Sequence, residues 1–305
     1  MIIDLPQTTT SAVNKRLVRL RDEGGAVALG RVLTLVIEAS DDELEDAIAA
    51  ANDASREHPC RVLAISTSGR KRSTSLDAQI RVGGDAGASE VVVLKPQGEL
   101  VEHLDTLVIP LLLPDAPIVV WWPGEAPEVP AADAVGAMAQ RRITDSTTCA
   151  KPLHTLQELR GGYEAGDTDL AWTRITLWRG LLAAALDENP HGKITRAEVE
   201  GDGRHTSVDL LAAWLAEQLR VPVEIMRRRD VDGVTGVRIW RGDTLIELAR
   251  PDGKTVTISQ TGSPDRRLSL PLRQLNECLA EELRRLDPDE VYGRVLTKGL
   301  ARVGL

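Results

Sequence analysis

The sequence predicts an α/β N-terminal domain with a mainly parallel sheet, followed by an α+β C-terminal domain with an antiparallel meander. Three observations lead to this prediction. Strand-like and helix-like segments alternate up to about residue 160, as in a parallel α/β sheet. The run Ile118-Val119-Val120 lacks polar alternation, which is typical of a strand covered on both faces. Beyond residue 220, β-rich segments follow one another through turns such as Asp252-Gly253.

The length of 305 residues favours two domains, because one hydrophobic core seldom organises so long a chain. The segment 161–167 is polar and rich in glycine, which makes it the best candidate for a linker. We therefore expect an N-terminal α/β domain at residues 1–162 and a C-terminal α+β domain at residues 163–305.

In the first half, helices are expected to alternate with strands. The first helix has Ser11 as a possible cap, and the second carries a run of carboxylates at the positive end of its dipole. The expected helices cover residues 11–23, 41–57, 99–107, 134–140 and 152–160. The expected strands cover residues 27–38, 60–67, 78–82, 90–94, 118–122 and 142–144.

In the second half, a long helix is expected first, and the meander follows. Apolar residues at helical spacing predict helices at 170–186, 206–219 and 272–286, with a further short helix after Pro288. The expected strands cover residues 194–199, 221–226, 236–240, 244–249 and 255–260.

Composition and charge exclude several classes of function. The net charge of −9 opposes binding to nucleic acid, and the basic clusters are short and scattered. The most apolar stretch, residues 108–122, is too short and too broken by proline to span a membrane, and residues 1–16 do not resemble a secretory signal. Three cysteines without a close pair suit a reducing cytosol and are expected to be buried structural thiols. We expect a cytoplasmic protein.

No complete catalytic motif occurs in the chain. A P-loop and a nucleophile elbow are both missing, and the turn 83–87 lacks the dinucleotide spacing and leads into a strand. The five histidines are separated, and the His154–Glu158 pair, which lies i and i+4 on a predicted helix and can share a ligand, is more typical of a surface contact. We therefore expect no catalytic residues, no metal and no cofactor, although an enzyme whose site is dispersed along the chain stays open.

One loop has the composition of a phosphate site. Cations lie among hydroxyl groups after a parallel-type strand, and charge-assisted hydrogen bonds from such groups hold phosphate. The candidate residues are Ser68, Arg70, Lys71, Arg72 and Ser73. The alternative is a solvated loop without a ligand.

Three segments carry a family resemblance. They are residues 109–124 (IPLLLPDAPIVVWWPG), 141–146 (RRITDS) and 169–179 (DLAWTRITLWR). In this order and at these intervals they resemble the glucose-6-phosphate dehydrogenase assembly proteins of actinobacteria and cyanobacteria. The resemblance implies a non-catalytic protein that binds glucose-6-phosphate dehydrogenase and promotes its active oligomeric form in the oxidative pentose phosphate pathway. The isolated cysteines carry no redox role from that family.

The expected partner contacts are rich in Trp and Arg, the residues that dominate interface hot spots. One group, Trp172, Arg174, Trp178 and Arg179, lies on the predicted helix 170–186, where Arg174 and Trp178 are placed for a cation–π contact. The alternative is that both Trp side chains fill a core that has no Phe.

A second candidate group lies on two neighbouring strand-like segments. Trp121 and Trp122 end a predicted parallel strand, at the edge where ligand crevices form in open α/β sheets. Arg141, Arg142 and Asp145 can form an ion-pair network or contact a partner. Core and scaffold roles are the alternative for all five residues.

Two hypotheses for function follow. The first is an allosteric activator that binds the dehydrogenase and favours its assembled state. The alternative is a regulatory protein that binds a phosphosugar or a nucleotide.

Overall fold

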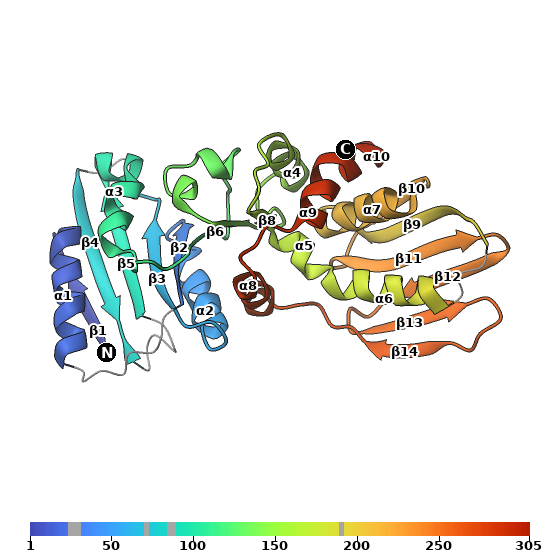
Figure 1. Ribbon diagram of the computed structural model, residues 1–305, viewed down its shortest axis with the longest axis horizontal. Coiled ribbons are helices and arrows are strands. Elements are labelled where there is room, and N and C mark those ends of the chain that lie inside the picture. Colours follow the sequence, from blue (N-terminus) through green and yellow to red (C-terminus); the bar gives the residue numbers. More distant parts are fainter. Residues whose placement is uncertain (24–31, 70–72, 84–89, 189–191) are drawn as a thin grey trace.

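The computed structural model describes residues 1–23, 32–69, 73–83, 90–188 and 192–305, which form two sheets placed side by side along the long axis of the molecule (Figure 1). The strand order in the first sheet is β1-β4-β5-β3-β2-β6-β7-β8. The bounds are β1 (Ile2–Leu5), β2 (Leu33–Ala39), β3 (Cys60–Ser66), β4 (Ser75–Arg81), β5 (Glu90–Gln97), β6 (Ile118–Trp122), β7 (Arg141–Thr144) and β8 (Asp167–Asp169).

The first sheet is mainly parallel, as the sequence predicts. Each neighbouring pair from β5 to β8 is parallel, whereas β1 and β4 add an antiparallel edge. Every residue of β2 and β3 is buried, because helices cover both faces. Helices α1 (Thr10–Glu23) and α3 (Leu104–Val108) pack on one face, and α2 (Leu44–Ala54) and α8 (Leu275–Arg284) pack on the other.

The second sheet is mainly antiparallel and has the order β10-β9-β11-β12-β13-β14. Only the β9–β10 pair in it is parallel. The bounds are β9 (Ile194–Asp202), β10 (Val223–Arg228), β11 (Val234–Arg241), β12 (Thr244–Ala249), β13 (Thr255–Gln260) and β14 (Arg266–Ser269). This arrangement confirms the predicted antiparallel meander, to which the structure adds β14.

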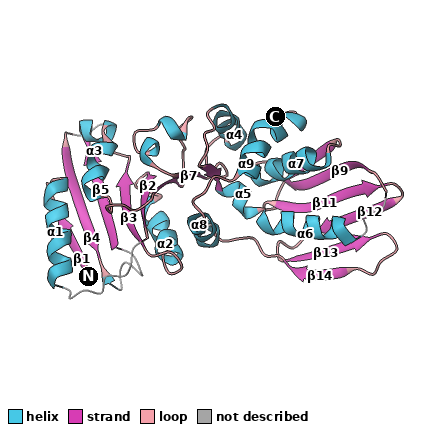
Figure 2. Cartoon of the chain, viewed as in Figure 1, coloured by secondary structure: helices cyan, strands magenta, loops and turns pink. Residues whose placement is uncertain are grey.

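Helices cover one face of the second sheet and the junction between the sheets (Figure 2). Helices α6 and α7 supply apolar side chains to the core of the second sheet, and the elements after residue 290 close the same core. The bounds are α4 (Pro152–Gly161), α5 (Leu170–Arg174), α6 (Thr176–Glu188), α7 (Thr206–Leu219), α9 (Glu290–Arg294) and α10 (Leu300–Arg302). Within the described residues, no helix combines the length and apolar character that a bilayer crossing requires.

The chain crosses between the two sheets more than once. After β14 it returns to the first sheet, where α8 packs against α2 and buries Cys278, Leu279 and Leu283 in the first core. The division at residues 162 and 163 therefore stays a prediction. Helix α8, although it lies late in the chain, belongs to the core of the N-terminal half.

Two expected segments differ from the prediction for tertiary reasons. The expected linker, residues 161–167, ends in strand β8, whose residues Asp167, Thr168 and Asp169 are all buried. The expected helix 170–186 is interrupted at Ile175, which separates α5 from α6. The local sequence pattern does not reveal either feature. Asp167 is held by Arg142, and Arg174 before the interruption is held by Asp145, and both partners lie in a distant segment of the chain.

Two further expected helices are shorter than predicted. Residues 99–107 divide into a 3₁₀ turn and α3, and within 134–140 only Gly136–Met138 forms a 3₁₀ turn. Part of the strand expected at 27–38 lies outside the described residues, and β2 begins at Leu33.

Trp side chains and small aliphatic residues build the cores of this chain, which has no Phe. Trp121, Trp172 and Trp178 are among the largest fully buried side chains. The three cysteines are buried and form no disulfide, and burial raises the pKa of the Cys149 and Cys278 thiols to about 11. High pKa values keep these thiols protonated, in agreement with a structural role.

The approach to β8 depends on a glycine. Gly166 has φ of +102°, and a Cβ at this position would lie 2.6 Å from the Gln140 carbonyl oxygen. We predict that Gly166→Ala lowers the free energy of unfolding by about 1–3 kcal/mol, because both the positive φ and the close approach oppose a side chain.

The matched control is Gly180→Ala in helix α6. A Cβ at Gly180 meets no atom within 4 Å, so the substitution should raise the free energy of unfolding by up to about 1 kcal/mol. Urea titration measures both values. Equal effects of the two substitutions would contradict the role assigned to Gly166.

Candidate functional site

The carboxyl ends of the parallel strands define the first place to search for a ligand. From β5 to β8 the order β5-β3-β2-β6-β7-β8 is that of a doubly wound fold. Successive strands are added on one side of β2 as far as β5, and on its other side from β6 onward, so the switch point lies between β2 and β6. Ligands of such folds bind in the crevice at this switch point, with a pyrophosphate on the turn after the first strand. In this chain that turn is Ser40–Glu43.

The turn after β2 satisfies its own backbone donors. The Glu43 carboxylate accepts hydrogen bonds from the Ser40 N–H (3.1 Å) and the Ser40 hydroxyl (2.6 Å). The Asp41 N–H donates to the Ser68 hydroxyl oxygen (3.0 Å), and the Ser66 hydroxyl donates to the Asp41 carboxylate (2.7 Å). The Ser40 and Asp41 N–H groups are therefore already bonded to side chains and are not available to a phosphate.

The same turn is acidic and narrow. Asp41, Asp42 and Glu43 lie at the start of α2, and their charges repel a pyrophosphate. The Glu43 carboxyl group also packs against Gly124 after β6, where a Cβ would lie 2.1 Å from its Oε1 atom. The residues at the switch point therefore do not fit the dinucleotide that this fold class implies.

A cavity of about 350 Å³ lies beside this turn, and it too is lined by acidic groups. Glu38, Glu102 and Asp133 contribute carboxyl groups to it. Glu38 is 7% exposed and receives a hydrogen bond from the Trp122 indole N–H (3.2 Å). Its Oε1 atom has no hydrogen-bond partner among the described residues. Burial, with the nearby Asp133 charge, raises the pKa of Glu38 to about 8.

Strand β7 makes three buried ion pairs with the later part of the chain. Arg141 pairs with Glu282 of α8, and Arg142 pairs with Asp167 of β8. Just after the strand, Asp145 receives two hydrogen bonds from Arg174 of α5, at 2.8 and 2.6 Å. The sequence analysis named this ion-pair network as one of two roles for Arg141, Arg142 and Asp145, and the structure contains it.

A second carboxylate, Asp169, extends the network toward α7. It accepts hydrogen bonds from the Thr144 hydroxyl, the Ser146 N–H and hydroxyl, and the Ala171 N–H. The Ser146 and Thr206 hydroxyls are 2.7 Å apart, which links the first sheet to the start of α7. Burial, together with the Asp145 charge, raises the pKa of Asp169.

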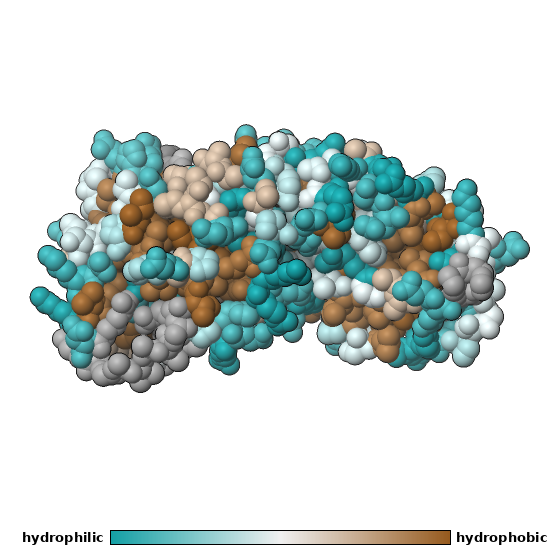
Figure 3. All heavy atoms as spheres, viewed as in Figure 1, coloured by the Kyte–Doolittle hydropathy of each residue, from teal (hydrophilic) through white to brown (hydrophobic). Residues whose placement is uncertain are grey.

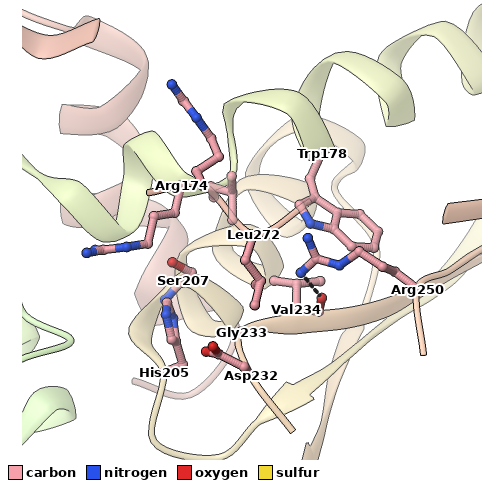
Figure 4. A pocket seen from close by; sticks show the side chains of 11 residues that line it. Arg174, Trp178, His205, Ser207, Asp232, Gly233, Val234, Arg250 and Leu272 are labelled. Carbon is pink, nitrogen blue, oxygen red and sulfur yellow. Dashed lines mark hydrogen bonds between the residues drawn. The ribbon is translucent and has the colours of Figure 1, made fainter. Parts of the chain in front are cut away.

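A second cavity, of about 100 Å³, lies next to this network (Figure 4). It brings together residues from α5, α6, α7 and β11, Arg250 directly after β12, and the segment before α8. Its polar lining consists of Arg174, His205, Ser207, Asp232, Arg250 and Arg273. Within the described residues, no group of three or more His, Cys, Asp or Glu side chains is placed to hold a metal ion.

The Trp residues proposed as partner contacts are buried. Trp121, Trp122, Trp172 and Trp178 are each at most 3% exposed. They occupy the core positions that the sequence analysis gave as the alternative, so a contact with a partner through their rings requires rearrangement. Their role in partner binding stays a prediction.

The expected stacking of Arg174 on Trp178 does not occur, because the helix is interrupted at Ile175 and Arg174 turns to Asp145. Arg179 instead lies 3.6 Å from the centre of the Trp172 ring. Arg250, from the second sheet, lies 5.2 Å from the centre of the Trp178 ring.

The candidate phosphate loop is described only at its ends. Arg70, Lys71 and Arg72 lie outside the described residues. The Ser68 hydroxyl bonds to the acidic turn after β2, and Ser73 is exposed. Phosphate binding by this loop stays a prediction.

Sequence reasoning did not single out Glu38, His205 or Arg250. The signal for Glu38 is a lone charge in an apolar strand, LTLVIEA, and Arg250 directly follows the strand-like segment TLIELA. Such a charge marks a buried ionisable group, but only the fold shows that a cavity adjoins it.

The fold resembles that of two-domain oxidoreductases. A 3-ketoreductase from Actinomadura kijaniata in complex with TDP-benzene and NADP aligns with a TM-score of 0.50 and 11% identity, over 89% of this chain and 96% of that chain. An oxidoreductase from Sinorhizobium meliloti aligns with a TM-score of 0.50 and 12% identity, over the same shares. The chain therefore shares the fold of these oxidoreductases. Its turn after β2 is acidic, and Glu43 fills the space beside Gly124.

Two family profiles match consecutive parts of the chain. The N-terminal domain of the glucose-6-phosphate dehydrogenase subunit matches residues 51–161, and the C-terminal domain of the same subunit matches residues 165–296. Together they span most of the chain, which belongs to this family of glucose-6-phosphate dehydrogenase assembly proteins.

A curated relative agrees with this family. The OxPP cycle protein OpcA of Synechocystis sp. is 25% identical over 140 residues. The match covers 43% of this chain and 29% of that protein, so it spans less than a third of the relative's length.

The Asp145–Arg174 pair should be essential to stability. Arg174→Met would leave Asp145, whose side chain is 1% exposed, without its cation beside buried Asp169. We expect a loss of about 3–5 kcal/mol in urea unfolding. The control Arg266→Met, in an exposed pair with Glu188, should cost less than about 1 kcal/mol. Equal losses would contradict the assignment.

The buried Glu38 predicts a pH dependence of stability. Its folded pKa exceeds its unfolded value of 4.5, so stability is fully present below the unfolded value and decreases as the pH rises through about 8. Glu38→Gln should stabilise the fold by about 1–3 kcal/mol at high pH and by much less at low pH. Thermal unfolding at the two pH values tests this, with exposed Glu224→Gln as control. A gain that does not depend on pH would contradict the prediction.

Proposed function

We propose that this chain is a non-catalytic, cytoplasmic accessory subunit that binds glucose-6-phosphate dehydrogenase and promotes its active oligomeric form. The observation that carries the proposal is the match of both halves of the chain, in order, to the two domains of a glucose-6-phosphate dehydrogenase subunit. The relative named for the OxPP cycle supports the same pathway.

The switch point supports a non-catalytic role. A dehydrogenase of this fold class needs a turn that accepts the pyrophosphate of its cofactor. Here Ser40 and Asp41 donate their N–H groups to side chains, and Glu43 fills the space against Gly124. A chain that has this fold but lacks a pyrophosphate-binding turn is suited to act as an accessory subunit of an enzyme that binds the cofactor.

We place the contact on the face of the second sheet that points away from α6 and α7. Along β9, β11 and β12, buried residues alternate with partly exposed ones, which form this second face. Arg196 stacks on Trp240 there, 3.5 Å from the ring centre. Exposed Met226 extends the face onto β10 next to Glu200. Aromatic, Met and Arg side chains are enriched in protein interfaces.

An activator of this kind acts through differential affinity. If the chain binds the assembled dehydrogenase more tightly than the dissociated subunits, it shifts the equilibrium toward assembly. Coupling of about 1–3 kcal/mol, or roughly 5–150-fold, is typical. By reciprocity, a substrate that favours the assembled dehydrogenase should tighten binding of this chain.

The first test is light scattering after size exclusion of the chain, the dehydrogenase of the same organism, and their mixture. We expect a joint peak of higher mass, with higher dehydrogenase activity than the enzyme alone. An unrelated dehydrogenase should show neither effect. Separate peaks with unchanged activity, in the presence and absence of substrate, would contradict the proposal.

A pair of variants tests the proposed contact face. Met226 on β10 is 40% exposed and Leu177 on α6 is 48% exposed, so both accept a charge without loss of core packing. We expect Met226→Glu to weaken the complex about tenfold or more, and Leu177→Glu to leave the affinity unchanged. The reverse result would move the contact to the helical face.

A further inference from the structure

The cavity between Arg174 and Arg250 has the features of an anion site (Figure 4). Three arginines, Arg174, Arg250 and Arg273, line it, and they come from three separate parts of the chain. The guanidinium group of Arg174 extends away from the cavity toward Asp145 (Figure 4). The Ser207 side chain at the start of α7 also lines the cavity. Because α7 has 14 residues, its N-terminal end contributes a positive potential.

Two of the three cations are already neutralised. Arg174 is bonded by both Nη atoms to Asp145, and Arg273 is bonded to Glu281. Arg273 also donates to the Thr173 carbonyl. Neither residue therefore requires a further anion.

Arg250 is different, because within the described residues its buried side chain forms no ion pair at contact distance. The residue is 3% exposed, and its Nη atoms donate to the carbonyl oxygens of Leu270 (3.0 Å) and Val234 (2.6 Å). Its Nε atom has no partner within the described part of the chain. Burial lowers the pKa of Arg250, and the charges of Asp232 and Asp252 act in the opposite direction.

The remaining lining residues fit the hydroxyl groups of an organic ligand. The Ser207 N–H donates to Nδ1 of His205, so the neutral imidazole carries its proton on Nε2. Burial lowers the pKa of His205, which favours this neutral form. Exposed Asp232 lies across from His205 (Figure 4). A neutral donor and a carboxylate acceptor at the rim suit hydroxyl groups.

We propose that this cavity binds the oxyanion group of a small hydroxylated metabolite, with the carboxylate or phosphate group next to Arg250 and the hydroxyl groups next to His205 and Asp232. The volume of about 100 Å³ encloses the acid group, and the rest of the ligand extends toward the rim. This site is separate from the loop at residues 68–73. It does not depend on the proposed partner.

The position of the cavity gives such a ligand a regulatory effect. Arg174 is paired with Asp145, which follows β7 of the first sheet, and Arg273 lies in the segment that leads to α8, which packs on the first sheet. Arg250 directly follows β12 of the second sheet. A ligand held by Arg250 therefore lies against residues that lead to both sheets and changes how the two sheets respond to a partner.

The test is a calorimetric titration of the full chain with inorganic phosphate, gluconate, glucose 6-phosphate and glucose. We expect the three anions to bind and glucose not to bind, and the anion with the higher affinity identifies the acid group. Binding of glucose with equal affinity, or absence of heat with every anion, would overturn the proposal.

Variants locate the site. Arg250→Met keeps most of the side-chain volume and should weaken anion binding about tenfold or more. If that variant does not fold, Asp232→Asn provides an independent test at the exposed rim, where loss of a negative charge should tighten binding of inorganic phosphate a few-fold. The control Arg266→Gln, in an exposed pair with Glu188, should not change the affinity. Unchanged affinity in both Arg250→Met and Asp232→Asn would overturn the assignment.

Discussion

Three ion pairs made by β7 and the turn after it join the first half of the chain to its later segments. Arg141, Arg142 and Asp145 each bind a partner that lies beyond residue 163, in α8, β8 and α5. Because a buried charge is costly unless it is paired, each pair fixes its later segment against the end of β7. In this way α8 and β8 are held on the first sheet, and Arg174 is held toward Asp145 beside the second cavity.

The carboxyl edge of the first sheet differs from a cofactor site in its charge and in its hydrogen bonds. The turn after β2 bonds its own N–H groups, and Glu43 occupies the space beside Gly124. The adjoining cavity contains Glu38, with a raised pKa, where an anionic ligand is disfavoured. Positive charge is found instead at the junction, around Arg250. In the view of Figure 3, hydrophilic residues cover the surface over the junction, between more hydrophobic areas on each half.

The sequence predicted the elements whose pattern is local. The bounds of β6, β12, β13 and α7 agree with the expectation, because apolar spacing alone defines them. Strand β8 was missed, since Asp167, Thr168 and Asp169 look like a loop until Arg142 and other distant partners are in place. For the site, the sequence identified Arg141, Arg142 and Asp145 as charges that can form an ion-pair network or contact a partner. It could not separate buried Trp from exposed Trp, because a core without Phe uses Trp for both purposes.

The chain shares its fold with oxidoreductases, but its turn after β2 does not fit the pyrophosphate of a dinucleotide. The most direct measurement is the fluorescence of NADPH titrated with the purified chain. We predict that the emission and its anisotropy stay unchanged, because the Ser40 and Asp41 N–H groups are bonded to side chains and the carboxylates of the turn repel a pyrophosphate. Saturable enhancement of the emission, lost in a variant of this turn, would contradict the account and make the chain a cofactor-binding protein.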